Sequence, residues 1–332
     1  MLSEKIKEEI KKLEGPIVVF GAGGFIGVNL FHTLLEQRND VYGVTQDRRN
    51  NWRFIASNIP EQNILDCDIN DLTILKELLS QLKPKTIFNL AAYGAYSKQK
   101  EYKKIYDTNF NSTITLIETL KSFGFSAYVH AGSSSEYGLN SAAPLEDADL
   151  VPNSHYAVSK AASYYAVKYY GKIEQLPVSH LRLYSAYGPW EEPDRLIPIL
   201  ISKARKKTYP PFVDSLISRD FIYVTDVCSA FIAAAHKIQT IKGEAFNIGV
   251  GVKTTIGELA NVMQEEFSIP EKPTFSGMPN RNWDVADWYS NSNKAKKLLD
   301  WEAKIDLKQG IKMVDQWQQK VNFDTAFWNW NK

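Results

Sequence analysis

The sequence predicts an α/β fold in which helices cover both faces of a doubly wound parallel sheet. Short apolar runs, bounded by glycine, proline or polar residues, alternate along the chain with longer segments of helical periodicity. A glycine-rich turn also follows the first apolar run directly, where the first strand of such a sheet meets its first helix. Strands that alternate with helices in this way form parallel sheets.

The predicted strands and helices alternate up to residue 183, with no internal repeat and no low-complexity linker. An amphipathic helix over 3–13 comes first, because Ile6, Ile10 and Leu13 recur at helical spacing. Six strands are predicted, at 17–20, 41–44, 63–65, 86–90, 127–130 and 178–183. Helices are predicted at 26–37, 72–82, 105–122 and 156–171. After Gly188 prolines and aromatic residues interrupt the pattern, which favours a smaller second lobe, with a return to the first lobe around 221–236 left open.

Composition excludes several classes of function. A net charge of +1 over 332 residues gives no electrostatic reason to bind nucleic acid or an anionic membrane. Cys67 and Cys228 are the two cysteines, so we expect neither a disulfide framework nor a metal site. The first residues are too charged for a signal peptide, and no apolar run approaches the roughly 20 residues that span a bilayer. We therefore expect a cytoplasmic protein.

The glycine turn predicts a dinucleotide-binding site. Gly21, Gly24 and Gly27 lie between the first strand and the first helix. In this setting one glycine makes the tight turn, one lets the backbone approach a pyrophosphate, and one allows close helix packing. The amides that begin the helix, around Phe25 and Ile26, then stabilise negative charge together with the helix dipole. The alternative is a purely structural turn.

The end of the second strand bears on the choice between NAD and NADP. Proteins that bind NAD place an acid there, which accepts hydrogen bonds from the ribose and repels a 2′-phosphate. Thr45 occupies that position here, with Arg48 and Arg49 close by, so the pattern leans slightly toward NADP. Asp47, two residues after Thr45, can restore a preference for NAD, and both cofactors stay open.

Tyr156 and Lys160 are the candidate chemical groups. Residues four apart share one face of a helix, and a neighbouring ammonium lowers the pKa of a phenol toward the working range. Upstream, the run Ser133-Ser134-Ser135 follows a predicted strand, at the edge where parallel sheets bind ligands. A serine there can donate a hydrogen bond to a substrate oxygen. A surface helix and an ordinary loop are the alternatives.

In order and spacing these motifs resemble those of the extended short-chain dehydrogenases. The glycine turn, Asn89-Leu90-Ala91-Ala92, the serine run before Tyr137-Gly138 and the Tyr156/Lys160 pair carry the resemblance. That family includes nucleotide-sugar epimerases, dehydratases and 4-ketoreductases. The resemblance implies a Rossmann-type domain mainly over 1–188 and a smaller C-terminal lobe mainly over 189–332 that binds a nucleotide-diphosphate sugar. It also implies a homodimer built on the helices at 105–122 and 156–171.

The resemblance also implies roles for particular residues. Tyr156 is the acid/base, Lys160 its activator and Ser133 the hydroxyl partner, since counting back from Tyr137 favours Ser133 over its two neighbours. Further cofactor contacts are implied at Asp68, Ile69, Leu90, Ala91 and Ala92. Substrate contacts are implied at Tyr93, Ser134, Ser135, Arg219 and Arg281. Paired arginines suit a diphosphate because guanidinium binds phosphate in a bidentate manner, although each can also form a structural ion pair.

The residues that follow Ser133 in the chain help to distinguish the subfamilies of this family. The 4,6-dehydratases carry an acid pair directly after the active-site hydroxyl residue, where this chain has Ser134 and Ser135; Glu136 fits only if the loop is one residue shorter. We therefore expect an epimerase that transiently oxidises C4 of the hexose, with an NADPH-dependent 4-ketoreductase as the alternative. Tyr156 and Lys160 argue against a non-catalytic dinucleotide sensor, and only the tryptophan-rich tail at 327–330 favours an interaction protein.

Overall fold

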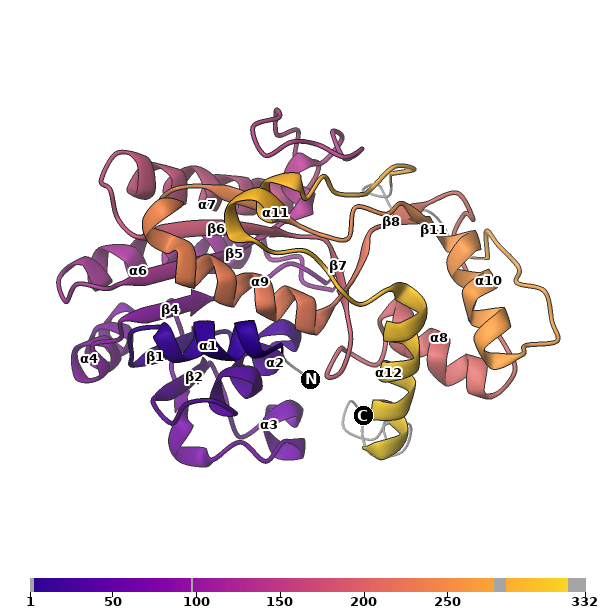
Figure 1. Ribbon diagram of the computed structural model, residues 1–332, viewed down its shortest axis with the longest axis horizontal. Helices are drawn as coiled ribbons and strands as arrows, with labels where there is room; N and C mark the ends of the chain where they lie inside the picture. Colours follow the sequence, from indigo (N-terminus) through magenta and orange to yellow (C-terminus); the bar gives the residue numbers. More distant parts are fainter. Residues whose placement is uncertain (1–2, 97, 278–284, 322–332) are drawn as a thin grey trace.

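A seven-stranded parallel sheet forms the centre of the protein (Figure 1). The computed structural model describes residues 3–96, 98–277 and 285–321. The strands are β1 (Ile17–Phe20), β2 (Val41–Thr45), β3 (Ile64–Asp66), β4 (Thr86–Asn89), β5 (Ala127–Ser133), β6 (Val178–Leu183) and β10 (Ala245–Ile248). Their order is β10-β6-β5-β4-β1-β2-β3, and every pairing is parallel. The predicted doubly wound sheet is therefore confirmed, and its order reverses between β1 and β4.

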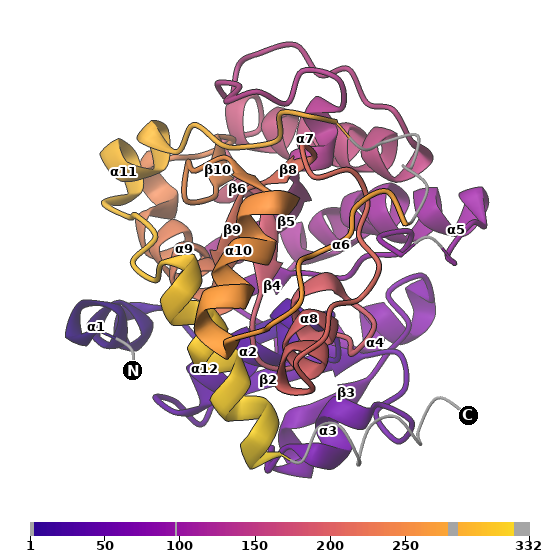
Figure 2. The same cartoon turned by 90° about the vertical axis from the view of Figure 1, so that its right-hand side faces the viewer.

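Helices cover both faces of the sheet, and each face has its own apolar core (Figure 2). One face packs against α1 (Glu4–Lys12), α2 (Phe25–Leu35), α9 (Val224–Lys237) and α11 (Asn293–Leu299). The other packs against α4 (Leu72–Leu82), α6 (Ser112–Lys121) and α7 (His155–Lys172). Because both faces are buried, β1 is wholly apolar, as its short apolar run predicted, whereas β6 also carries the buried polar residues Ser179, His180 and Arg182.

Two features of this layer differ from the sequence prediction. The predicted helix at 105–122 is divided into α5 (Tyr102–Tyr106), a π-helical turn at Asp107–Asn111 and α6. The seventh strand, β10, was missed, since it follows the irregular region and contains only four residues. It pairs with β6, so the chain returns to the sheet after leaving it.

The remaining elements form a smaller lobe beside the sheet, at the right of Figure 1. Its core joins α8 (Leu196–Arg205), α10 (Ile256–Phe267) and α12 (Leu307–Lys320). Two short sheets flank it, β7 (Ser185–Tyr187) with β9 (Phe221–Tyr223) and β8 (Ser218–Arg219) with β11 (Thr254–Thr255). A short helix, α3 (Trp52–Ala56), follows β2.

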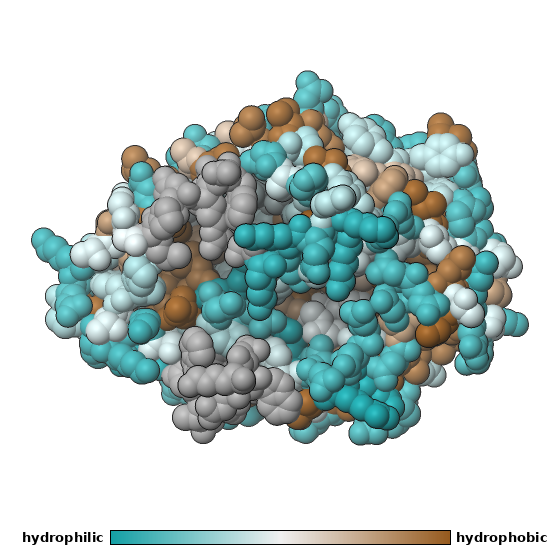
Figure 3. Space-filling view, turned by 180° about the vertical axis from the view of Figure 1, so that it is seen from behind, coloured by the Kyte–Doolittle hydropathy of each residue, from teal (hydrophilic) through white to brown (hydrophobic). Residues whose placement is uncertain are grey.

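Hydrophilic side chains cover much of the surface on the side turned away in Figure 1 (Figure 3). Among the described residues, no helix has both the length and the apolar character that a membrane span requires. Arg281 and the tail at 327–330 lie outside the described residues.

The packing of α9 on the sheet supplies a test of the fold. Phe231 is fully buried, and its ring meets the ring of Phe88 on β4 edge to face, with centroids 6.2 Å apart. We expect Phe231→Ala to lower the free energy of unfolding by about 3–5 kcal/mol, the usual effect of removing a buried aromatic ring. Chemical denaturation measures this. Leu216→Ala, at a side chain that is 69% exposed, is the control, and an equal effect of both changes would contradict the packing.

Candidate active site

The candidate site lies along the carboxyl-terminal edge of the parallel strands. Gly21 follows β1, Asp68 lies shortly after β3, Ala91 follows β4 and Ser133 ends β5. Parallel strands place these ends along one edge, and ligands of such sheets bind where the strand order reverses. The structure thus brings the predicted cofactor residues to one side of the sheet.

The glycine turn has the geometry of a phosphate cradle. Gly21 has φ +74°, a left-handed conformation, and a Cβ there would lie 2.6 Å from the Ala91 nitrogen. A Cβ on Gly27 would lie 2.1 Å from the Gly21 carbonyl oxygen, so α2 can approach the turn only with glycine at this position. The exposed N-cap, Gly24, offers no side-chain cap to the first amides of α2, at Phe25 and Ile26. These residues fit the pyrophosphate of a dinucleotide.

Two residues that sequence reasoning missed hold the turn from behind. Asn51 donates to the Gly23 carbonyl oxygen at 2.9 Å, and the buried Arg53 donates to the same oxygen at 3.2 Å. Arg53 also donates to the Trp190 carbonyl oxygen at 2.7 Å, which ties the turn to the segment that leads into the second lobe. Neither residue belongs to a recognisable motif, so only the fold identifies them.

The charged residues after β2, at the ribose end of the candidate site, form contacts with other residues of the protein. The Arg48 guanidinium lies 3.2 Å from the Asp66 carboxylate and donates to the Ile64 carbonyl oxygen. Asp47 accepts hydrogen bonds from the amides of Arg49 and Asn50, which makes a local turn. Arg48 is thus bonded to the neighbouring strand β3, and Asp47 to its own loop.

The other predicted cofactor residues lie beside this end of the sheet. The Asp68 carboxylate accepts hydrogen bonds from Gln46 and Asn70, and Ile69 is buried. Leu90 donates its amide to the Phe20 carbonyl oxygen at 2.9 Å. After it the chain emerges at the surface, where Ala91 is half-buried and Ala92 exposed.

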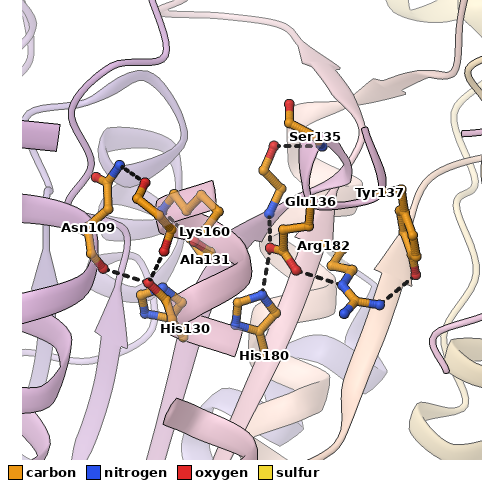
Figure 4. A network of polar contacts seen from close by, with 12 residues as sticks. Asn109, His130, Ala131, Ser135, Glu136, Tyr137, Lys160, His180 and Arg182 are labelled. Carbon is orange, nitrogen blue, oxygen red and sulfur yellow. Dashed lines mark hydrogen bonds and ion pairs between the residues drawn. The ribbon is translucent and has the colours of Figure 1, made fainter. Parts of the chain in front are cut away.

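Ser133, Tyr156 and Lys160 come together between β5 and α7. Ser154 caps α7 by accepting a hydrogen bond from the Ala157 amide, which places Tyr156 in the first turn. Lys160 is 1% exposed and donates to the Ala131 carbonyl oxygen at 2.8 Å (Figure 4). Burial lowers the pKa of Lys160 to about 8. The Ser133 hydroxyl interacts with the Tyr156 phenol and lowers its pKa, against the larger effect of burial.

The sequence predicted a lowered pKa for Tyr156, and for the polypeptide alone this prediction is wrong. Burial raises the pKa of Tyr156 to about 12, and the Ser133 hydroxyl only partly offsets this. The Lys160 ammonium is bonded to Ala131 and lies 5.9 Å from the centre of the Tyr156 ring. Helical spacing placed the two side chains on one face but could not show the direction of the ammonium.

The π-helical turn in the 102–121 helix fixes the chain after β4. The Asn109 side chain accepts from the Tyr93 amide at 2.8 Å and donates to the Tyr93 carbonyl oxygen at 2.8 Å. It also donates to the Ser159 hydroxyl on α7 at 2.8 Å. Asn109 thus joins the Tyr93 segment to the helix that carries Tyr156. The Tyr93 hydroxyl contacts Glu101.

On the second lobe, a tryptophan links two of the predicted substrate residues. The Trp288 indole donates to the Ser134 hydroxyl at 2.9 Å, and the Arg219 guanidinium lies 4.8 Å from the centre of the Trp288 ring. The Ser135 amide donates to the Ser133 hydroxyl at 3.1 Å. Sequence reasoning missed Trp288, which no motif marked.

A second missed cluster lies near Tyr156, at the start of the second lobe. The Arg195 guanidinium lies 5.5 Å from the centre of the Tyr96 ring and 3.6 Å from the Glu191 carboxylate. Glu191 is only 6% exposed, and burial raises its pKa to about 8 although Arg195 opposes the shift. The Arg195 charge also lowers the pKa of Tyr156 slightly, so this cluster acts electrostatically on the candidate base.

Glu136 lies on the far side of Ser133, away from the sheet edge. Its carboxylate is fully buried and contacts His180 at 2.8 Å and Arg182 at 2.7 Å, both on β6. The alternative prediction that Glu136 is the acid of a dehydratase is therefore wrong, because both of its carboxylate oxygens contact buried residues of β6.

The fold and this edge define a dinucleotide-binding enzyme of the short-chain dehydrogenase type. The chain belongs to the NAD dependent epimerase/dehydratase family, whose family model matches residues 17–249.

Individual relatives match over nearly their whole length. The chain is 31% identical to a UDP-glucose 4-epimerase of Mycolicibacterium smegmatis, covering 91% of this chain and 98% of that protein. Its fold is similar to that of a UDP-glucose 4-epimerase of Thermotoga maritima, solved with UDP-glucose, with a TM-score of 0.80, 25% identity and coverage of 92% and 99%. A dTDP-glucose 4,6-dehydratase of Bacillus anthracis, solved with NAD, has a TM-score of 0.76, 29% identity and coverage of 92% and 96%.

The buried Glu191 carboxyl gives a pH-dependent stability. Its folded pKa of about 8 lies above the ordinary value, so the folded protein holds a proton that the unfolded chain releases. This contribution is complete below the ordinary pKa and is lost as the pH rises through about 8. We expect wild type to lose about 1 kcal/mol more stability per pH unit than Glu191→Gln between about pH 5 and 8.

Urea unfolding at several pH values measures this difference. Glu271→Gln, at an exposed position, is the control and should follow wild type. Parallel curves for wild type and Glu191→Gln would contradict a raised pKa.

Proposed function

We propose that this protein is an NAD-dependent nucleotide-sugar 4-epimerase. The observation that carries the proposal is the grouping of Ser133, Tyr156 and Lys160 at the sheet edge, together with the inward direction of the Glu136 carboxylate, which pairs with Arg182. Oxidation and reduction at C4 need one proton carrier and one hydrogen-bond partner, and this grouping supplies both.

Each of the three residues has one task in this proposal. A bound nicotinamide cofactor would supply the hydride acceptor and donor for the sugar carbon, and the glycine turn with the residues after β3 and β4 would hold it. Tyr156 removes the proton of the C4 hydroxyl and later gives it back. Ser133 donates a hydrogen bond that positions the same oxygen. Lys160 supports the phenolate, since a cation nearby favours the charged form of a phenol.

A 4,6-dehydratase is the less favoured candidate, although one of the similar structures has that name. Eliminating water from the sugar needs an acid and a base close to C5 and C6. Ser134 and Ser135 occupy the positions of that pair, and the Ser134 hydroxyl already accepts from Trp288. Glu136 cannot replace them, because its carboxylate pairs with His180 and Arg182.

The cofactor in this proposal is NAD rather than NADP. The sequence leaned to NADP because Arg48 and Arg49 follow Thr45, but the Arg48 guanidinium is paired with Asp66. The NAD bound in the similar dehydratase structure supports the same choice. A ketoreductase that consumes NADPH is the second candidate, and the nature of the bound cofactor separates the two.

The substrate side of the proposal places a nucleotide-diphosphate sugar between the two lobes. Arg219, next to Trp288, and Arg281 would bind the diphosphate, and Ser134, Ser135 and Tyr93 would lie near the sugar. Residues 189–332 thus serve mainly as the substrate lobe, with the α9–β10 segment returning to the sheet. A cytoplasmic homodimer completes the proposal; exposed Tyr165 and Tyr169 on α7 suit such a contact.

Removing the phenol oxygen tests the acid/base role. We expect Tyr156→Phe to lower kcat for interconversion of UDP-glucose and UDP-galactose by about 10²–10⁴-fold, the range that general acid–base catalysis contributes. Product sugars are separated and quantified after incubation with each UDP-sugar, UDP-glucuronate included.

Tyr165→Phe is the matched control, because it removes the same atom from an exposed side chain on the same helix. The control should keep its activity, and both variants should unfold at the wild-type temperature. Full activity in Tyr156→Phe would disprove the assignment.

The bound cofactor separates an epimerase from a ketoreductase. An epimerase regenerates its cofactor in each turnover, so we expect the purified protein to release stoichiometric NAD when denatured, identified by mass spectrometry. A protein without nucleotide that binds NADPH more tightly than NADH would instead favour the ketoreductase.

A further inference from the structure

A buried carboxylate lies directly behind the candidate serine. Glu136 lies in the short helical turn that follows β5, and its side chain points back into the protein (Figure 4). Its carboxylate accepts a hydrogen bond from the Ser133 amide at 2.8 Å, while the Ser133 hydroxyl accepts from the Ser135 amide. This reciprocal pair is a capping box, which fixes the backbone from which the Ser133 side chain projects.

The carboxylate is itself held from β6. Arg182 donates to one carboxylate oxygen at 2.7 Å, and the His180 ring nitrogen lies 2.8 Å from the other. Arg182 is positioned in turn by the Tyr137 hydroxyl at 2.7 Å and the Glu146 carbonyl oxygen at 2.9 Å. The side chains of Glu136, His180 and Arg182 are fully buried.

Strand β5 leaves room at Gly132 for the contact between Glu136 and His180. A Cβ on Gly132 would lie 2.0 Å from the His180 ring nitrogen and 2.6 Å from the Glu136 carboxylate. Glycine therefore permits the contact between Glu136 and His180 across β5, one residue before Ser133. Such close packing of charged groups against the strand that carries Ser133 limits the movement of that residue.

The carboxylate is charged at neutral pH. Burial alone would raise its pKa, but His180 and the Arg182 guanidinium hold the pKa of Glu136 below its usual value. Burial lowers the pKa of His180, while the Glu136 carboxylate opposes this shift. The negative charge of Glu136 is thus held in the interior between β5 and β6, where it forms a buried ion pair with the Arg182 guanidinium.

That charge acts on both candidate residues of α7. Burial lowers the pKa of Lys160, and the Glu136 charge opposes this and raises it. The same charge raises the pKa of Tyr156. The other titratable groups around Glu136 and its partners are His130 on β5, Tyr137 and Glu146 before α7, and Tyr164 on α7.

We propose that Glu136 is a positioning residue of the epimerase reaction, which fixes the Ser133 backbone by its hydrogen bond and keeps Lys160 charged from behind. This inference rests on the proposed function, because it acts through Ser133 and Lys160. A glutamate that served stability alone would pair with Arg182 and His180 in the same way, but its replacement would leave kcat and the pH dependence of kcat unchanged in the folded protein.

The pH dependence of turnover tests the electrostatic part. Glu136→Gln keeps the shape and the acceptor for the Ser133 amide but removes the charge. We expect kcat at neutral pH to fall about tenfold, the effect of losing one charge-assisted hydrogen bond. The alkaline limb of the kcat profile should move to lower pH by about one unit, since Lys160 loses a neighbouring opposite charge.

Two further variants separate position from charge. Glu136→Asp keeps the charge but withdraws the carboxylate by one methylene, so kcat should fall while the alkaline limb stays in place. If Glu136→Gln does not fold, this variant carries the test, and an unchanged kcat would overturn the proposal. Glu146→Gln is the matched control, a second buried glutamate that accepts a backbone amide, from Asn247 at 2.9 Å, and has no contact with Ser133.

A measurement without turnover keeps this inference distinct from the proposed function. Lysine labelled with ¹³C at the ε position reports the titration of Lys160 by NMR, with Lys160→Arg to assign the signal. The midpoint should fall in Glu136→Gln and stay in Glu146→Gln. Equal midpoints in wild type and Glu136→Gln would overturn the inference, whereas an inactive wild type would overturn the epimerase proposal alone.

Discussion

The parallel arrangement of the strands is the constraint on which the rest of the structure depends. Parallel pairing places the ends of β1, β4 and β5 at one edge, with the reversal of strand order between β1 and β4. The glycine turn and Ser133 therefore meet at that edge although more than a hundred residues separate them in the chain. A phosphate cradle and a proton carrier can then serve one cofactor and one substrate.

Burial and charge oppose each other at the candidate chemical groups. Burial raises the pKa of Tyr156 and lowers that of Lys160, so it favours the neutral form of both. The charges that resist burial come from outside the Tyr156/Lys160 pair, from Glu136 behind Lys160 and from Arg195 near Tyr156. The pKa values of Tyr156 and Lys160 thus depend on burial and on charges from the turn after β5 and from the second lobe, and not only on the spacing of two residues on a helix.

The two lobes are joined by contacts that reach the glycine turn. Arg53 bonds both Gly23 and Trp190, and the Trp190 ring contacts Trp317 of α12, with centroids 5.2 Å apart. The segment that leads into the second lobe therefore rests on the phosphate end of the site. A movement of the second lobe would therefore displace the glycine turn, because closely packed interiors transmit displacement.

The amino-acid sequence was sufficient to predict the sheet class, the glycine turn, six of the seven strands of the main sheet and the helix that carries Tyr156 and Lys160. These are local properties, since periodicity and glycine spacing reflect the backbone of neighbouring residues. Only the tertiary structure decided that β10 joins the sheet, that Trp288 links Ser134 to Arg219, and that Glu136 faces inward to Arg182. These contacts join residues far apart in the chain, and their energies depend on burial, which no local pattern records.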